Sequence, residues 1–264
     1  MSGLLQEKLS CKVEKKMKLY QDYIFDLYGT LVDIRTNEEQ HALWNKLSLL
    51  FGYYGADYLP EVLHESYLSL VHTKEKHKKD TKQEYYSHEA YPEIPIEEVF
   101  AELYTNKGVQ PSNELVLHTG QMFRVLSTSY IRLYAGAKEL LQQLRANGSR
   151  VFLLSNAQRI FTEYELKYLQ IYDCFDGILI SSDYGVKKPD ERFFKILLEK
   201  YSIEPKEALM IGNDLSSDIA GAKNVGIDTF YIHSAISPKT TADKISADYS
   251  MTHMNLRKLQ RLLL

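Results

Sequence analysis

The sequence has 264 residues, of which 44% are hydrophobic and 25% are charged, a composition typical of globular proteins that excludes wholesale disorder. Lys and Arg number 32 against 35 Asp and Glu, and the net charge of −3 gives no electrostatic basis for binding nucleic acid or an anionic membrane. The two cysteines exclude a disulfide framework and favour a reducing cytoplasm. No apolar run reaches the roughly 18–20 residues that a membrane span needs.

The chain opens with a polar segment that precedes its first strand. Residues 1–18 lack the apolar stretch of a signal peptide, and we interpret them as an N-terminal extension. Residues 22–26 form a short apolar run that predicts a buried strand. The Leu-Tyr-Gly-Thr sequence of residues 27–30 then predicts a turn directly after it.

The middle of the chain predicts a helical module. Between residues 34 and 130 no segment has the pattern of a strand, whereas apolar residues recur at helical spacing in four places. The predicted helices cover residues 41–51, 62–71, 96–104 and 114–126. We therefore expect residues 34–130 to form an all-helical domain inserted into the rest of the chain.

The second half of the chain alternates between helix and strand. Apolar runs predict strands over residues 151–154, 177–180, 208–211 and 228–232. Helical periodicity covers residues 137–146, 161–169, 190–201, 219–224 and 256–263. This alternation predicts an α/β core, formed by residues 19–33 and 131–264, in which helices cover both faces of a parallel sheet.

Polar residues follow the predicted strands, where a parallel sheet binds its ligands. In chain order they are Asp26, Gly29, Thr30, Ser155, Asn156, Lys188, Asn213, Asp214 and Asp218. Asp26 can act as a nucleophile, as carboxylates do in covalent phosphoryl transfer. Asp26 and Asp214 can hold Mg²⁺, which prefers oxygen ligands. Hydroxyl groups and the Lys188 ammonium can bind and neutralise a phosphate.

Four of these segments resemble the motifs of the haloacid dehalogenase (HAD) superfamily. In order they are Phe25-Asp26-Leu27-Tyr28-Gly29-Thr30-Leu31, Ser155-Asn156, Lys188-Pro189-Asp190, and the segment from Gly212 to Ala222. The resemblance implies a Rossmann-like core with a helical cap inserted after the first strand. It also implies that Asp26 is the nucleophile, that Gly29, Thr30, Ser155 and Asn156 bind the substrate phosphate, and that Lys188 balances charge.

Two positions depart from the phosphatases of that superfamily. They place a second Asp, the general acid and base, where this chain has Tyr28, and a phenol with a pKa of about 10 is a poor base at neutral pH. In those phosphatases the residue at this position binds the metal through its backbone carbonyl. The resemblance therefore still allows Tyr28 to bind Mg²⁺. Asn213 stands where the superfamily usually has a metal-binding Asp, and Asp214 beside it is the alternative ligand, with Asp218 as support.

Tyr28 also matches the metal-independent 2-haloacid dehalogenases of the superfamily. Those enzymes carry an Arg after a Trp in the cap, whereas here Trp44 is followed by Asn45 and Lys46. We therefore predict a cytoplasmic, Mg²⁺-dependent phosphatase that hydrolyses a small phosphomonoester through an aspartyl-phosphate on Asp26. The alternatives are a dehalogenase and a binding or regulatory protein with weak turnover. Neither nucleic acid nor a membrane is an expected partner, and no motif sets an oligomeric state.

Overall fold

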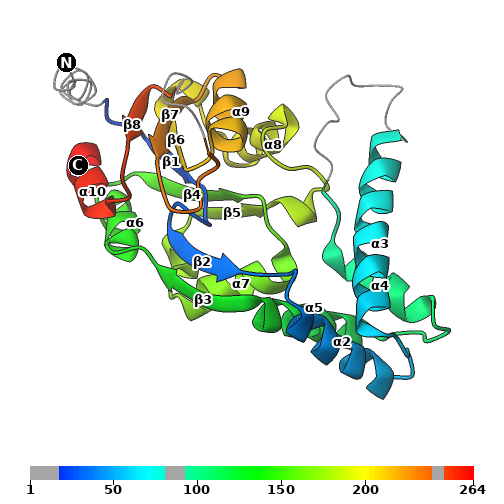
Figure 1. The fold of residues 1–264 in the computed structure, drawn as a ribbon. Helices are drawn as coiled ribbons and strands as arrows, with labels where there is room; N and C mark the ends of the chain where they lie inside the picture. Colours follow the sequence, from blue (N-terminus) through cyan, green and yellow to red (C-terminus); the bar gives the residue numbers. More distant parts are fainter. Residues whose placement is uncertain (1–17, 81–92, 240–246) are drawn as a thin grey trace, which may run out of the picture.

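The computed structural model describes residues 18–80, 93–239 and 247–264, so the predicted N-terminal extension lies outside the described residues except for Lys18. Six parallel strands form the central sheet (Figure 1). In spatial order they are β5 (Gly177–Ile180), β4 (Arg150–Ser155), β1 (Asp22–Phe25), β6 (Ala208–Gly212), β7 (Asp228–Ile232) and β8 (Tyr249–Met251). The predicted α/β, Rossmann-like fold class is confirmed.

Helices cover both faces of the sheet because the strands are apolar on both sides. One core cluster joins Tyr23 and Phe25 of β1 to the helices α6 (Ala137–Ala146), α7 (Arg159–Tyr168) and α10 (Leu256–Leu263). A second joins Ile24 of the same strand to α8 (Glu191–Tyr201) and α9 (Ala220–Asn224). Successive side chains of a strand point to opposite faces, so β1 contributes to both clusters and lies in the middle of the sheet.

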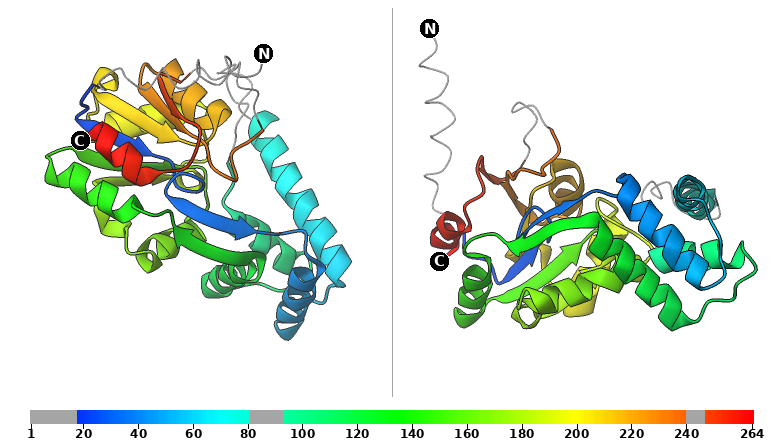
Figure 2. Two further views of the ribbon diagram at one scale, coloured as in Figure 1. Left: turned by 60° about the vertical axis from the view of Figure 1, so that its left-hand side comes forward. Right: turned by 60° about the horizontal axis from the view of Figure 1, so that its bottom comes forward.

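Four helices between residues 41 and 127, which we call the cap, share a hydrophobic core of their own. They are α2 (His41–Tyr53), α3 (Pro60–Asp80), α4 (Ile96–Thr105) and α5 (Asn113–Ser127). Their buried residues form a third cluster, and Ile160 of α7 belongs to it, so the cap packs directly on the α/β core. Gly120 of α5 permits this close approach, since a Cβ there would lie 2.5 Å from Ile160 Cδ1. Figures 1 and 2 show the cap helices gathered beside the sheet.

Two strands that the sequence did not predict join the cap to the core. Strands β2 (Val32–Thr36) and β3 (Thr128–Leu133) form an antiparallel ribbon where the chain leaves the core and returns to it. The prediction of no strand between residues 34 and 130 is therefore wrong at both ends. The outer residues of the ribbon are polar and partly exposed, so they give no continuous apolar run of the kind that indicates a buried strand.

The remaining elements are short. Three 3₁₀ turns span Tyr172–Cys174, Ser181–Asp183 and Pro205–Glu207, and a π-helical turn, Leu215–Ile219, precedes α9. Strand β8 was not predicted, because a partly exposed strand of three residues carries too little pattern. Among the helices of the described segments, none combines the length and the apolar character that crossing a membrane requires.

Candidate active site

The site is built around Asp26, the first residue after β1. Asp26 is 8% exposed, and its backbone N–H donates to the Ile211 carbonyl at 3.0 Å, which extends the pairing of β1 with β6. Strands pair with β1 on both sides, so backbone hydrogen bonds fix where the carboxylate projects. It lies at the carboxyl edge of the sheet, where parallel sheets of this kind bind ligands.

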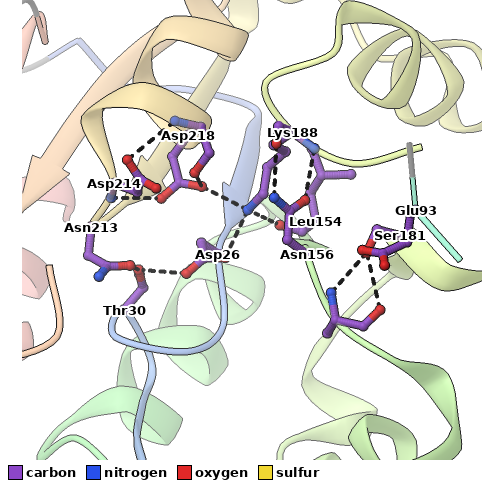
Figure 3. A network of polar contacts seen from close by, with 12 residues as sticks. Asp26, Thr30, Glu93, Leu154, Asn156, Ser181, Lys188, Asn213, Asp214 and Asp218 are labelled. Atoms are coloured by element: carbon purple, nitrogen blue, oxygen red, sulfur yellow. Dashed lines mark hydrogen bonds and ion pairs between the residues drawn. The ribbon is translucent and has the colours of Figure 1, made fainter. Parts of the chain in front are cut away.

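Lys188 contacts one oxygen of this carboxylate. Its Nζ donates to Asp26 Oδ1 at 2.8 Å and to the Leu154 carbonyl at 2.7 Å, and it lies 2.8 Å from Asp218 Oδ1 (Figure 3). Burial alone lowers the pKa of a lysine, but the charges of Asp218 and Asp26 outweigh this effect and raise the pKa of Lys188. The ammonium is therefore charged at neutral pH and faces two carboxylates.

Asn156 fixes the backbone of Lys188. The Lys188 N–H donates to Asn156 Oδ1 at 2.8 Å, and Asn156 Nδ2 donates to the Lys188 carbonyl at 2.9 Å. The neighbouring Lys187 turns the other way and pairs with Glu75 of α3 at 3.3 Å. Of the two adjacent lysines, Lys188 enters the site, and Asn156 acts on its position rather than on Asp26.

Asp218 lies behind Lys188 and is 1% exposed. Its Oδ2 accepts a hydrogen bond from the Asp214 N–H at 3.0 Å, and Gly212 leaves room for it, since a Cβ there would lie 2.3 Å from the same oxygen. Burial raises the pKa of Asp218 to about 6, although the charge of Lys188 acts in the opposite direction. Asp218 is therefore a second carboxylate that contacts the Lys188 ammonium, at the same 2.8 Å as Asp26.

Thr30 and Asn213 lie on the other oxygen of Asp26. Thr30 Oγ1 donates to Asp26 Oδ2 at 3.1 Å. The inner end of the Asn213 amide lies 3.2 Å from Thr30 Oγ1, 3.2 Å from the Tyr28 carbonyl oxygen and 3.3 Å from Asp26 Oδ2. Gly29, with a φ of 87°, leaves room for the Asn213 side chain, because a Cβ at residue 29 would lie 2.8 Å from Asn213 Cγ.

Asp214, the alternative metal ligand, faces the start of the next helical turn. Its Oδ1 accepts hydrogen bonds from the Ser216 N–H at 2.8 Å, from Ser216 Oγ at 2.6 Å and from the Ser217 N–H at 3.3 Å. Burial raises the pKa of a carboxylate, but these hydrogen bonds outweigh it and lower the pKa of Asp214. This carboxylate caps a helix, and Asn213 is the residue that faces Asp26.

Ser155 is the buried polar group of the site that is left unsatisfied. It ends β4 and is 0% exposed, and its Oγ has no hydrogen-bond partner among the described residues. A buried hydroxyl without a partner costs about 1–3 kcal/mol of stability. A ligand oxygen would satisfy it, which agrees with the phosphate-binding role predicted for Ser155.

The Tyr28 side chain is turned away from Asp26. Its hydroxyl donates to Glu165 Oε2 at 2.5 Å and lies 3.0 Å from Thr162 Oγ1, both on α7. Arg124 of the cap helix α5 binds the same carboxylate with two nitrogens, at 2.6 and 3.1 Å, and lies over the rings of Tyr28 and Phe161. Burial, followed by the charge of Glu165, raises the pKa of Tyr28 above its ordinary value. The phenol is therefore a neutral donor at physiological pH.

A second cap contact braces the loop that follows Ser155. Glu93 accepts hydrogen bonds from Ser181 Oγ at 2.8 Å and from Gln158 Nε2 at 3.0 Å. Ser181 Oγ in turn accepts from the Ala157 N–H at 2.9 Å, and Figure 3 shows Glu93 beside Ser181. Sequence reasoning did not find Glu93, Gln158, Glu165 or Arg124, because no local pattern links residues that pair across the cap and the core.

The groups around Asp26 fit a hard cation in kind. The described residues contain no cluster of three or more His, Cys, Asp or Glu side chains that could hold a metal. One carboxylate oxygen, one backbone carbonyl and one side-chain amide do converge, from Asp26, Tyr28 and Asn213. These are oxygen donors of the kind that Mg²⁺ takes, together with water and substrate phosphate.

The haloacid dehalogenase-like hydrolase family matches residues 23–226. This chain belongs to that family. It is 38% identical to a glyceraldehyde 3-phosphate phosphatase of Pyrococcus abyssi over 39% of this chain and 43% of that protein. The corresponding enzyme of Pyrococcus furiosus is 33% identical over 48% and 53%. The chain thus spans about half the length of each of these relatives. A ribulose-1,5-bisphosphate 5-phosphatase of Halopiger xanaduensis is 28% identical over 72% and 78%.

Solved structures of the family share this fold. A HAD phosphatase from Thermococcus onnurineus superposes with a TM-score of 0.56 and 22% identity, covering 94% of this chain and 98% of its own. A 2-haloacid dehalogenase from Pseudomonas syringae superposes with a TM-score of 0.61 and 21% identity, covering 93% and 98%. The fold of this chain superposes on both a phosphatase and a dehalogenase. The fold therefore does not separate the two reactions, and the site residues must distinguish between them.

Proposed function

We propose that the chain is a Mg²⁺-dependent phosphatase that hydrolyses a small phosphomonoester through a phosphorylated Asp26. The observation that carries the proposal is the asymmetric setting of the Asp26 carboxylate. Lys188 contacts one oxygen, whereas Thr30 and the Asn213 amide lie on the other. The hydroxyl of Ser155, which has no partner in the described part of the chain, lies at the neighbouring strand end. A nucleophile, a charge-balancing ammonium and an anion-binding hydroxyl thus share one edge of the sheet.

The reaction has two steps. A carboxylate oxygen of Asp26 attacks phosphorus, and the bond between phosphorus and the ester oxygen breaks, so the alkoxide leaves with the electron pair of that bond and takes up a proton from solvent water. Water then attacks the phosphorus of the aspartyl-phosphate and gives up a proton to solvent, the bond between phosphorus and the Asp26 oxygen breaks, and inorganic phosphate leaves with the carboxylate restored. Lys188 stays charged throughout and offsets the repulsion between Asp26 and the phosphate.

Asp26, the Tyr28 carbonyl and Asn213 are the groups that would hold Mg²⁺. When bound, the cation neutralises charge on the phosphoryl oxygens. Thr30 orients Asp26 through the hydrogen bond at 3.1 Å, and Ser155 offers its hydroxyl to a phosphate oxygen. The Tyr28 hydroxyl donates its proton to Glu165, so this proton is not available to the leaving alkoxide. We therefore expect the enzyme to prefer substrates whose leaving groups are weak bases.

The curated relatives support a phosphatase over a dehalogenase, because three of them are named as phosphatases of small sugar phosphates or bisphosphates. The cap supports the same choice. Asn45, where the dehalogenases have Arg, bonds to His41 on the same helix, and Lys46 is exposed. Trp44 is buried in the cap and donates to the Glu38 carbonyl. The cytoplasmic location stays a prediction from composition.

Three assays separate the candidate functions. A phosphatase turns over p-nitrophenyl phosphate with Mg²⁺ and loses that activity in EDTA. A dehalogenase releases halide from 2-haloacids in EDTA. A binding or regulatory protein binds phosphate or beryllofluoride, measured by calorimetry, and is silent in both assays. Halide release without metal, or silence with phosphate binding, would each overturn the proposal.

A further inference from the structure

The amide of Asn213 lies between two different sets of oxygen atoms. Its inner end faces Thr30 Oγ1, the Tyr28 carbonyl and Asp26 Oδ2, all within 3.2–3.3 Å. Thr30 has a single hydroxyl proton, which can go to Asp26 Oδ2 at 3.1 Å or to Asn213 Oδ1 at 3.2 Å. When it goes to Asp26, all three atoms at this end are acceptors, and the amide turned with its nitrogen inward donates to them. An amide N–H satisfies such a set, whereas an amide oxygen meets only other oxygens unless a cation lies among them.

The outer end of the amide faces two hydroxyl groups of the loop after β7. Ser234 Oγ lies 3.3 Å and Ser237 Oγ 3.4 Å from it. The two hydroxyls are also 3.3 Å from each other, and the Ser234 N–H donates to Ser237 Oγ at 3.0 Å, so the loop holds them in place. A hydroxyl rotates to donate or to accept. This pair can therefore serve either orientation of the amide.

We propose that the Asn213 amide nitrogen takes the place of the cation in the metal-free protein, and that the amide turns its oxygen inward when Mg²⁺ binds. The turning of the amide on Mg²⁺ binding rests on the proposed function. The placement of the amide nitrogen depends only on the contacts of the metal-free chain. In the metal-free state the N–H groups donate to Asp26 and to the Tyr28 carbonyl. In the other orientation the N–H groups donate to Ser234 and Ser237.

This arrangement gives a physical reason for Asn at position 213. An Asp there would bring a second carboxylate within about the same 3.2–3.3 Å of the Tyr28 carbonyl and Asp26 Oδ2, where like charges repel strongly unless a cation separates them. Asn removes that repulsion and supplies a donor. The expected consequence is a site that binds Mg²⁺ more weakly than an Asp-containing one but is stable without it.

The first experiment compares Asn213→Asp with the wild type by thermal unfolding of the full chain in EDTA and in Mg²⁺. In EDTA the substitution should lower the Tm by about 4–8 °C, and Mg²⁺ should restore most of that loss. Asn113→Asp, at an exposed position on the cap, is the matched control and should respond equally in both buffers. An Asn213→Asp variant that is as stable in EDTA as the wild type would overturn the inference that the amide nitrogen replaces the cation in the metal-free protein.

The second experiment observes the amide directly. Protein labelled with ¹⁵N-asparagine gives side-chain amide signals, and the Asn213 pair is identified by its absence from the Asn213→Asp spectrum. Adding Mg²⁺ alone should shift this pair while leaving the Asn113 pair unchanged. Mg²⁺-dependent turnover of p-nitrophenyl phosphate with no shift would overturn the inference and leave the proposed function standing. No Mg²⁺ binding together with no turnover would refute the proposed function, and the turning of the amide with it.

Discussion

Two buried ion clusters flank the turn that follows β1, and they differ in charge balance. In the first, the single cation Lys188 faces the two carboxylates of Asp26 and Asp218 at 2.8 Å each. The cluster carries excess negative charge, and the hydroxyl of Ser155 at the neighbouring strand end has no partner among the described residues. We call this cluster incomplete, because its carboxylates outnumber its ammonium and a buried hydroxyl beside it lacks a partner among the described residues.

The second cluster is complete by itself. Arg124 and Glu165 form one buried ion pair, and the Tyr28 hydroxyl and two aromatic rings close it off. Burial lowers the pKa of an arginine, but the hydrogen bond and charge of Glu165 outweigh it and raise the pKa of Arg124. The comparison shows that burial of charge alone does not identify a catalytic site. The unbalanced charge and the unsatisfied hydroxyl are the features on which the proposed active site rests, whereas the balanced cluster joins the cap to the core.

The largest effect should come from removing the nucleophile. Asp26→Asn keeps the shape of the side chain but not its negative charge, so turnover of p-nitrophenyl phosphate should fall by about 10⁴-fold or more. The matched control is Asp33→Asn, since Asp33 is also buried but is bound by Arg132 on the ribbon. Its turnover should stay within about threefold of wild type. Retained turnover in Asp26→Asn would show that this carboxylate is not the nucleophile.

Breaking the complete cluster should affect stability more than chemistry. Arg124→Met leaves Glu165 buried without its cation, and removing one partner of a buried ion pair costs about 3–5 kcal/mol of unfolding free energy. Urea unfolding measures this loss. Lys167→Met is the control, because its partner Glu163 is on the surface and such pairs contribute about 0–1 kcal/mol. An unfolding free energy that Arg124→Met leaves unchanged would contradict the structural role of the cluster.

The sequence predicted the core and the first cluster because their signals are local. Strands β5 and β7 were predicted with the bounds that the structure has, and each site residue follows directly from a strand or lies in a short motif. Lys188 was predicted from its place in the Lys188-Pro189-Asp190 motif. The topology of a parallel sheet then brings the strand ends together, although Asp26 and Lys188 lie 162 residues apart.

The second cluster and the ribbon could not be predicted in this way. Arg124 and Glu165 are 41 residues apart, and Tyr28 and Glu165 are 137 apart, with no shared motif. Arg124 and Glu165 each look like an ordinary surface charge on an amphipathic helix. The orientation of the Tyr28 side chain could not be predicted either. Its position in the first motif suggested the loss of an acid and base rather than a contact with the cap.

The pH dependence of stability should reveal the incomplete cluster. Burial raises the pKa of Asp218 to about 6 in the folded protein. An acid whose pKa is higher in the folded than in the unfolded chain stabilises the fold at low pH, and this contribution is lost as pH rises through the folded pKa. In EDTA, the stability of the wild type relative to Asp218→Asn should therefore decrease by up to about 3 kcal/mol between pH 4 and 7. Urea unfolding at several pH values measures the difference, and an increase with pH would contradict this ionisation.

The smallest effect should come from Tyr28→Phe, and it tests directly which cluster the phenol serves. The substitution removes the hydrogen bond to Glu165 at 2.5 Å and leaves the ring under Arg124, so it should cost about 1.5 kcal/mol of unfolding free energy. The turnover of p-nitrophenyl phosphate and its pH profile should change less than about threefold, because the hydroxyl does not face Asp26. Tyr130→Phe, which removes a longer hydrogen bond at 3.2 Å on the ribbon, is the matched control. If turnover instead fell by about 10²-fold or more, the size expected for a lost acid or base, the phenol would belong to the chemistry of the incomplete cluster rather than to the complete one.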